Sequence, residues 1–299
     1  MEYKKGERVR HPKLEDWGLG QVLADSDNDS VKVFFVGVGE KVLSLKYVQP
    51  VHVSFENAHH PVLDNLKDKK YASKFKYQNL KQSISYFLTR FPEGFYGNNL
   101  KKELLNNNKK AHKQAQKLLN EELIIDCIIV SDYQQIIKNV LAVVNASKLI
   151  STVEKTDLRK AFLKENAQKK FSLSLYKLLY GKEPLQGRFV SFSKVLQELN
   201  IAKWTIASYF LFVMQPKSYL FIKPNITQHA SELCGFEINF KTQVNWLSYE
   251  STLKFSEYLF TELVALKPRD MTDVQSFMSC IAPIKGDKKA RPLKKDQRV

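Results

Sequence analysis

The chain has 299 residues, of which 43% are hydrophobic and 26% charged. This composition excludes wholesale disorder and is sufficient for one large domain or two smaller ones. Lysine and arginine number 47 against 31 aspartates and glutamates, a formal net charge of +16, which favours a polyanionic partner. No apolar run approaches the roughly 18 to 20 residues that cross a bilayer, and the N-terminus has no apolar signal core. We therefore expect a cytoplasmic protein with no membrane partner.

The positive charge is unevenly distributed along the chain. Residues 1–55 have zero net charge, whereas residues 56–123 carry +6, residues 124–275 carry +5 and residues 276–299 carry +5. A polyanion would therefore be attracted to the part of the chain that follows residue 55.

Residues 1–55 are predicted to form a small β-barrel. Val31, Val33 and Phe35 alternate with their neighbours in the period-2 pattern of a strand, and glycines divide the segment into four or five short strands. Closing so small a sheet into a barrel would remove its exposed edges. The expected core consists of Val9, Trp17, Val22, Val33, Phe35 and Val42.

Within this segment, residues 8–22 read RVRHPKLEDWGLGQV. This string resembles a small bacterial domain of unknown function that is similar to the Tudor or SH3-like barrels of CarD-type transcription regulators and of the tail of UvrD-type helicases. The resemblance covers about residues 5–50, and the rest of the chain resembles no characterised family. It implies binding to a protein, such as RNA polymerase or a helicase, or to nucleic acid, rather than catalysis.

Because residues 1–55 are neutral, we favour a protein partner for this domain. The candidate contact residues are Arg8, Arg10, His11 and Trp17. Two structural alternatives stay open: His11 could shape the turn after the first strand, and Trp17 could pack in the core.

Residues 56–76 lose the hydrophobic pattern and are expected to form a linker. His59 and His60 are adjacent, but no second pair lies at the spacing of a metal site, so we expect a solvated loop and no metal.

Residues 77–282 are predicted to form a larger, mainly α-helical domain, so the expected fold class is α+β. A helix expected from Asn99 to Glu122 is its most informative element. Its apolar stripe consists of Leu100, Leu104, Ala111, Ala115 and Leu118. The opposite side carries Lys102, Lys109, Lys110, Lys113 and Lys117 with few acids to pair them, which suits either a solvated face or contact with a phosphate backbone.

Later segments carry recognisable signals for helices. Ser151 and Glu154 match a capping box, the apolar segment 204–214 is expected to be a central buried helix, and Asp270 is the expected N-cap of a helix from Met271 to Ile281. A helix is expected from Asn245 to Leu266. The segments SYLFIKP and FEINFK are expected to form a two-stranded ribbon, and Arg269 is expected to pair with Asp270.

Residues 283–299 are expected to be a basic, flexible tail. Its candidate phosphate-contacting residues are Lys288, Lys289, Arg291, Lys294 and Lys295.

The sequence contains no recognisable catalytic motif and implies no cofactor. It lacks phosphate-binding loops, metalloprotease signatures and nucleophile motifs, and its three cysteines are too far apart for a zinc or disulfide framework. A nuclease site could be assembled only from sets without convincing spacing, namely Glu237 with Lys241, or Asp126, Asp132 and Glu154.

The hypothesis that these observations favour is a non-catalytic bacterial protein that binds nucleic acid, DNA in the first place. The helical domain and tail would hold the phosphate backbone while the barrel contacts a protein partner, for example in DNA processing, transcription or anti-phage defence. Two alternatives remain: an interaction subunit that never contacts nucleic acid, and a divergent metal-dependent nuclease.

Overall fold

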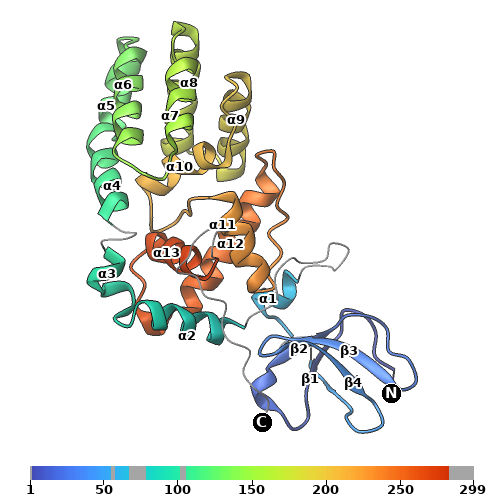
Figure 1. Ribbon diagram of the computed structural model, residues 1–299. Coiled ribbons are helices and arrows are strands. Elements are labelled where there is room, and N and C mark those ends of the chain that lie inside the picture. The colour runs from blue at the N-terminus through green and yellow to red at the C-terminus, as the bar shows by residue number, and fades with distance from the viewer. Residues whose placement is uncertain (1, 55–57, 67–78, 102–105, 283–299) are drawn as a thin grey trace. The chain divides into compact units, whose positions relative to one another are not determined.

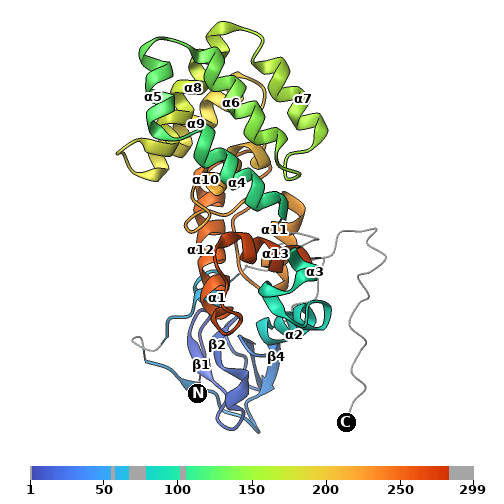
Figure 2. The same ribbon diagram turned by 90° about the vertical axis from the view of Figure 1, so that its left-hand side faces the viewer.

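The computed structural model describes residues 2–54, 58–66, 79–101 and 106–282 (Figures 1 and 2). It confirms the α+β class, with an N-terminal antiparallel sheet followed by a mostly helical region. The described residues form two compact units. The first takes its residues from Met1–Arg90 and Gln228–Ile238, and the second from Phe91–Thr227 and Asn239–Ile284.

The first unit contains a five-stranded antiparallel sheet in the order β4-β3-β2-β1-β5, whose strands β1 to β4 are the blue arrows of Figure 1. The strands are β1 (Arg8–Arg10), β2 (Leu19–Val22), β3 (Ser30–Phe35), β4 (Gly39–Ser44) and β5 (Val51–His52). A 3-10 helix, Glu15–Trp17, joins β1 to β2. Val9 lies opposite Gly20, which in turn lies opposite Phe35. Gly20 is required here because a Cβ at this position would lie 2.7 Å from the Phe35 ring.

The prediction of a closed barrel was wrong. Among the described residues, β4 and β5 are the two edges of the sheet and do not pair with each other. β5 is only two residues long and follows Pro50, which has no N–H to donate, so its ladder is limited to Val9–His52 and Arg10–Val51.

One face of the sheet packs around a small apolar core. Its buried members are Tyr3, Val9, Val22, Val31, Val33, Phe35 and Leu43, with Trp17 packed against them. The prediction that Val42 joins this core was wrong: it pairs with Lys32 on the other face and is 65% exposed, while the adjacent Leu43 points inward. Placing Val42 on the core face shifted the predicted alternation of inward and outward side chains on this strand by one residue.

The opposite face of the sheet is also occupied. Phe34 alternates with the core residues Val33 and Phe35 yet is only 6% exposed. On this face Arg8 lies opposite Gln21, and its guanidinium also bonds Asp64 Oδ1 at 2.8 Å and the carbonyl of Ala58 at 3.1 Å. Residues that follow the sheet therefore pack back onto it.

The range expected to be a linker contains a short helix, α1 (Pro61–Asp64), with Val62 and Leu63 buried. His60 is its N-cap, because Nδ1 accepts the N–H of Val62 at 3.2 Å. The expectation that His60 belongs to a solvated loop was therefore wrong. The predicted boundaries at residues 55, 76 and 283 fall on residues outside the described ranges, so they stay predictions.

The first unit is completed by residues from far along the chain. After α1, Leu66 forms an antiparallel bridge with Phe236, and the N–H of Glu237 donates to the carbonyl of Asn65 at 2.5 Å. The unit also contains α2 (Leu80–Arg90) and the second half of α11 (Pro224–Leu233).

The second unit is helical, and α5 to α9 run alongside one another in both views (Figures 1 and 2). Its α-helices are α3 (Asn98–Leu100), α4 (Asn106–Leu118), α5 (Glu121–Ile129), α6 (Tyr133–Asn145), α7 (Thr152–Ala161), α8 (Glu165–Tyr180), α9 (Leu185–Glu198), α10 (Trp204–Met214), α12 (Trp246–Glu262) and α13 (Met271–Ile281). Two 3-10 helices, Gly94–Tyr96 and Val264–Leu266, lie before α3 and after α12.

The central helix of this unit is α10, as predicted. All its residues except Thr205 are buried. Phe210 packs edge-on against Phe171 of α8, with ring centroids 5.8 Å apart, and the Tyr209 hydroxyl donates to the carbonyl of Val143 in α6 at 3.0 Å. The apolar sequence of α10 makes it the helix around which its neighbours are arranged.

The prediction that one helix continues to Glu122 was wrong. α4 ends at Leu118 and α5 begins at Glu121, so the break falls at Leu119 and Asn120. The Asn120 side chain accepts the N–H of Leu123 at 3.0 Å, so it begins a new helix whose first turn holds Glu121 and Glu122. An N-cap followed by two acids is favourable for a helix start, and this local preference ends the longer helix.

Other predicted helix signals were confirmed. Both bonds of the capping box between Ser151 and Glu154 are present, and Asp270 caps α13 by accepting the N–H of Thr272 at 2.8 Å. The helix expected from Asn245 begins there and continues to Glu262.

Two predicted features of the C-terminal region were wrong. Residues 218–223 and 236–241 form no ribbon, since Phe236 bridges to Leu66 instead. The guanidinium of Arg269 binds the buried Asp273 in two-pronged fashion, at 2.9 and 2.6 Å, and not Asp270. Asp273 lies one helical turn after Arg269, whereas the Asp270 carboxylate is used as the helix cap.

The cap of α1 makes the first unit sensitive to pH. Burial lowers the pKa of His60, and its Nδ1 can accept the Val62 N–H only when neutral. The unfolded chain takes up this proton near the ordinary histidine pKa of about 6.5, so the stability contributed by neutral His60 is present above that pH and is lost as the pH falls below it.

We therefore expect H60N to flatten the pH dependence of unfolding between pH 7.5 and 5.5, because asparagine is an N-cap at every pH. Urea unfolding at several pH values measures the effect, which is at most about 1.4 kcal/mol per pH unit for one proton. Parallel curves for the two proteins would contradict the assignment.

Candidate nucleic-acid interface

The exposed face of α4 carries four lysines. Lys109, Lys110, Lys113 and Lys117 are all exposed, whereas Ala111 and Ala115 have no exposed surface. At 3.6 residues per turn the four lysines fall within an arc of about 100°, opposite the buried alanines, and the row from Lys109 to Lys117 is about 12 Å long. Within the described part of the chain, none of the four forms an ion pair with a carboxylate.

Two polar side chains fix α4 against the end of α10. Nδ1 of His112 donates to the carbonyl of Val213 over 2.7 Å, and the Gln116 amide donates to the carbonyl of Met214 over 2.6 Å. The last carbonyls of a helix have no partner within the helix. His112 and Gln116 therefore satisfy buried acceptors that α10 itself cannot.

The C-terminal end of α4 is fixed in the same way. The Asn139 amide of α6 donates to the carbonyl of Leu118 at 3.1 Å, and the Tyr180 hydroxyl of α8 donates to that of Leu119 at 2.6 Å. Burial raises the pKa of Tyr180 to about 12, so this hydroxyl keeps its proton. Four side-chain bonds thus fix the helix that carries the lysines.

The lysine row is electrostatically unfavourable in isolation. The pairs Lys109–Lys113 and Lys113–Lys117 are four residues apart and Lys110–Lys113 three, and each like-charged pair costs a few tenths of a kcal/mol, about 1 kcal/mol together. Lys117 lies in the last turn, where the helix dipole attracts its positive charge and offsets part of this repulsion. A polyanion bound along the row would reduce the remaining repulsion among the lysines.

The remaining predicted phosphate-contacting residues lie outside the described ranges. They are Lys102, Lys288, Lys289, Arg291, Lys294 and Lys295. Their roles stay predictions.

The predicted partner residues of the N-terminal sheet differ in their surroundings. Arg10 is exposed, whereas the Arg8 side chain is only 15% exposed and holds Asp64. His11 is buried, its Nδ1 accepts the N–H groups of Lys13 and Leu14, and its ring lies 4.8 Å from the half-buried Trp17. Arg10 and the edge of Trp17 are therefore the parts of this set that a partner could reach.

Two of the carboxylates considered for a nuclease form hydrogen bonds that stabilise helices. Glu154 bonds Ser151 and Thr205, and Asp132 caps α6 by accepting the N–H of Gln135. Among the described residues, no three His, Cys, Asp or Glu side chains come together as metal ligands.

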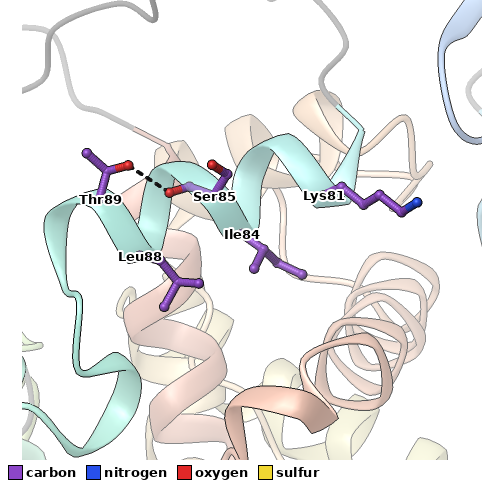
Figure 3. Close-up of a pocket in the computed structure, with 5 residues that line it drawn as sticks. All are labelled: Lys81, Ile84, Ser85, Leu88 and Thr89. Carbon is purple, nitrogen blue, oxygen red and sulfur yellow. Dashed lines mark hydrogen bonds between the residues drawn. The ribbon is translucent and has the colours of Figure 1, made fainter.

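A hollow of about 540 Å³ lies on α2 (Figure 3). It is lined by Lys81, Ile84, Ser85, Leu88 and Thr89, and the Thr89 hydroxyl donates to the carbonyl of Ser85 at 2.9 Å. Lys81 is the one titratable group in this lining, so the hollow offers no acid–base pair.

The fold and the lysine face define an α+β protein with an N-terminal antiparallel sheet and a basic helical unit. Residues 3–53 match a family model described as "Protein of unknown function (DUF3553)", which confirms the predicted similarity to a small domain of unknown function. No curated protein and no solved structure matches the chain. No helix in the described part of the chain combines the length and apolarity that crossing a bilayer requires.

The hydrogen bonds of His112 and Gln116 to α10 were not predicted from the sequence. Their partners in α10 lie about 100 positions away along the chain, so no local pattern indicates them. The one available signal was their place on the flank of the lysine stripe, between the charged and buried sides.

We expect Q116A to destabilise the second unit by about 1 kcal/mol, because the buried Met214 carbonyl loses its donor. Gln114, on the same helix, has no bonded partner among the described residues, so Q114A is the matched control and should leave the free energy of unfolding nearly unchanged. Urea unfolding followed by circular dichroism measures both. Equal losses for the two variants would contradict the anchoring role.

We also expect R8A to destabilise the first unit by about 1 to 2 kcal/mol, since it removes the bonds of a mostly buried guanidinium to Gln21, Asp64 and the Ala58 carbonyl. R10A, two residues along the same strand face, should change the free energy of unfolding by less than about 0.5 kcal/mol. Chemical denaturation of the two variants distinguishes a structural arginine from an exposed one; comparable stability of both would show that the Arg8 network contributes little.

Proposed function

We propose that this protein binds nucleic acid through the lysine face of α4, without catalysing a reaction. The observation that carries the proposal is the set of four exposed lysines, unpaired within the described residues, on a helix anchored by four side-chain bonds. Lysines contact phosphates as point charges and release the counterions condensed on the nucleic acid, which is the main source of sequence-independent affinity.

The basic residues between 285 and 298 support the same proposal by composition alone, because seven lysines and arginines there accompany two acids. A second positive segment would add to the electrostatic attraction without reading base sequence.

For the N-terminal sheet we propose a Tudor- or SH3-related domain that contacts a protein partner. Its antiparallel order and net neutrality support this. The exposed Arg10 and Leu14, the latter at 43% exposure, are side chains that a protein partner could contact. RNA polymerase or a helicase is the kind of partner that the resemblance of residues 8–22 suggests.

The test is the neutralisation of three lysines of the α4 row, K109Q/K113Q/K117Q. Glutamine retains helix propensity, so the fold should persist. We expect affinity for duplex DNA at roughly 50 mM salt to fall at least tenfold, and the slope of log K against log salt to decrease by about 1 per lysine removed. Fluorescence anisotropy with a labelled duplex measures both quantities.

The matched control is K182Q/K217Q/K241Q, which removes the same charge from three exposed loop positions of the second unit. It should change affinity and salt slope much less than the α4 variant. Equal losses would show that net charge alone attracts the nucleic acid, and unchanged binding by the α4 variant would remove this helix from the proposal.

A further inference from the structure

We infer that the α4 face binds double-stranded nucleic acid without selecting a sequence; this rests on the proposed function. The inference concerns the groups that accompany the four lysines and what each of them is already bonded to. Base sequence is read by side chains that place hydrogen-bond donors and acceptors against base edges, typically arginine, asparagine, glutamine and glutamate.

Of the histidine and glutamine side chains on α4, two are used inside the protein and the third, Gln114, lies outside the arc of the four lysines. His112 donates through Nδ1 to Val213, and the Gln116 amide donates to Met214. The charged side chains of the described part of α4 are lysines, with no arginine to form two-pronged bonds to guanine. The face therefore presents ammonium groups, which can hold phosphates but carry little sequence information.

The same face lacks the groups that single strands need. Proteins that bind single-stranded nucleic acid stack unpaired bases on exposed aromatic rings, and α4 contains no aromatic residue. Among the described residues of the second unit, Tyr96 is the exposed aromatic side chain. The Arg269 guanidinium already lies over its ring, with Cζ 5.1 Å from the ring centroid. The α4 face itself therefore offers charge and no stacking ring, which favours the duplex.

The geometry of the row also suits a duplex. Double-stranded DNA carries one phosphate charge for about every 1.7 Å of its axis, so the row of about 12 Å faces several phosphates at once. α4 is held by bonds to α10, α6 and α8, and it presents this row as a straight, preformed array. Single strands have lower charge density and release fewer counterions per lysine.

The experiment measures binding of the full-length protein to a labelled 25-base-pair DNA duplex and competes it with unlabelled probes. These are three duplexes of unrelated sequence and different G·C content, a duplex RNA of one of those sequences, and the corresponding single strands. We expect the duplex DNAs to differ in Kd by less than about threefold, because phosphate contacts are common to all of them, and the single strands to bind at least about fivefold more weakly. The duplex RNA should compete comparably with the duplex DNA, since its phosphates are the shared ligand.

The variant K109Q/K113Q/K117Q should weaken every duplex by the same factor. A duplex preferred by about thirtyfold or more, or single strands bound more tightly than duplexes, would overturn this inference while leaving the proposed function intact. If the variant still preferred duplexes to single strands, the surface that binds duplexes would lie elsewhere on the protein. Failure of all the probes to bind at low salt would overturn both the inference and the proposed function.

Discussion

The second unit depends on hydrogen-bond donors for the last carbonyl groups of α10, which have no partner within the helix. The last turn of α10, residues 210–214, is apolar and buried, so it has no polar side chain with which to satisfy the last backbone acceptors of the helix. His112 and Gln116 supply the missing donors from α4. One flank of α4 must therefore be polar and face α10, its alanines fill the space beneath, and the remaining arc is left to solvent. The lysines occupy that arc.

This arrangement explains how a row of like charges can persist on a helix. The repulsion within the row costs about 1 kcal/mol. The four side-chain bonds that anchor α4 contribute about 1 kcal/mol each, so the anchoring exceeds the repulsion. A helix of this composition would be marginal alone, since it contains three asparagines at its start and no acid for pairing. Tertiary contacts keep α4 helical, so its exposed lysines stay in one row that a partner could contact.

Features encoded over a few residues could be predicted from the sequence. The capping box at Ser151, the cap at Asp270 and the buried apolar segment of α10 were all correct, because their determinants lie within one or two helical turns. The break at Asn120 was missed although its signal was local, since the apolar stripe appeared to continue across it.

Other errors have a different cause. The Arg8 side chain bonds a residue 56 positions away, and the His112 side chain bonds one about 100 positions away. No periodicity encodes such pairs. The same limit applies to sheet closure: the strands could be counted, but whether β4 meets β5 depends on the length of β5 and on the chain that covers the sheet. For the candidate site, the lysines were found by their spacing, whereas the bonds that hold their helix required the structure.

The chain leaves the first unit at Arg90, builds most of the second, and returns at Gln228–Ile238 before leaving again. Leu66 meets its bridge partner only at Phe236, so the N-terminal unit is not complete when a ribosome has finished its first third. Domains usually fold in the order of their synthesis. Here residues 228–238, about four-fifths of the way along the polypeptide, join the first unit only after most of the second unit has been synthesised. The segment 3–53 defined by sequence similarity is therefore shorter than the compact unit to which it belongs.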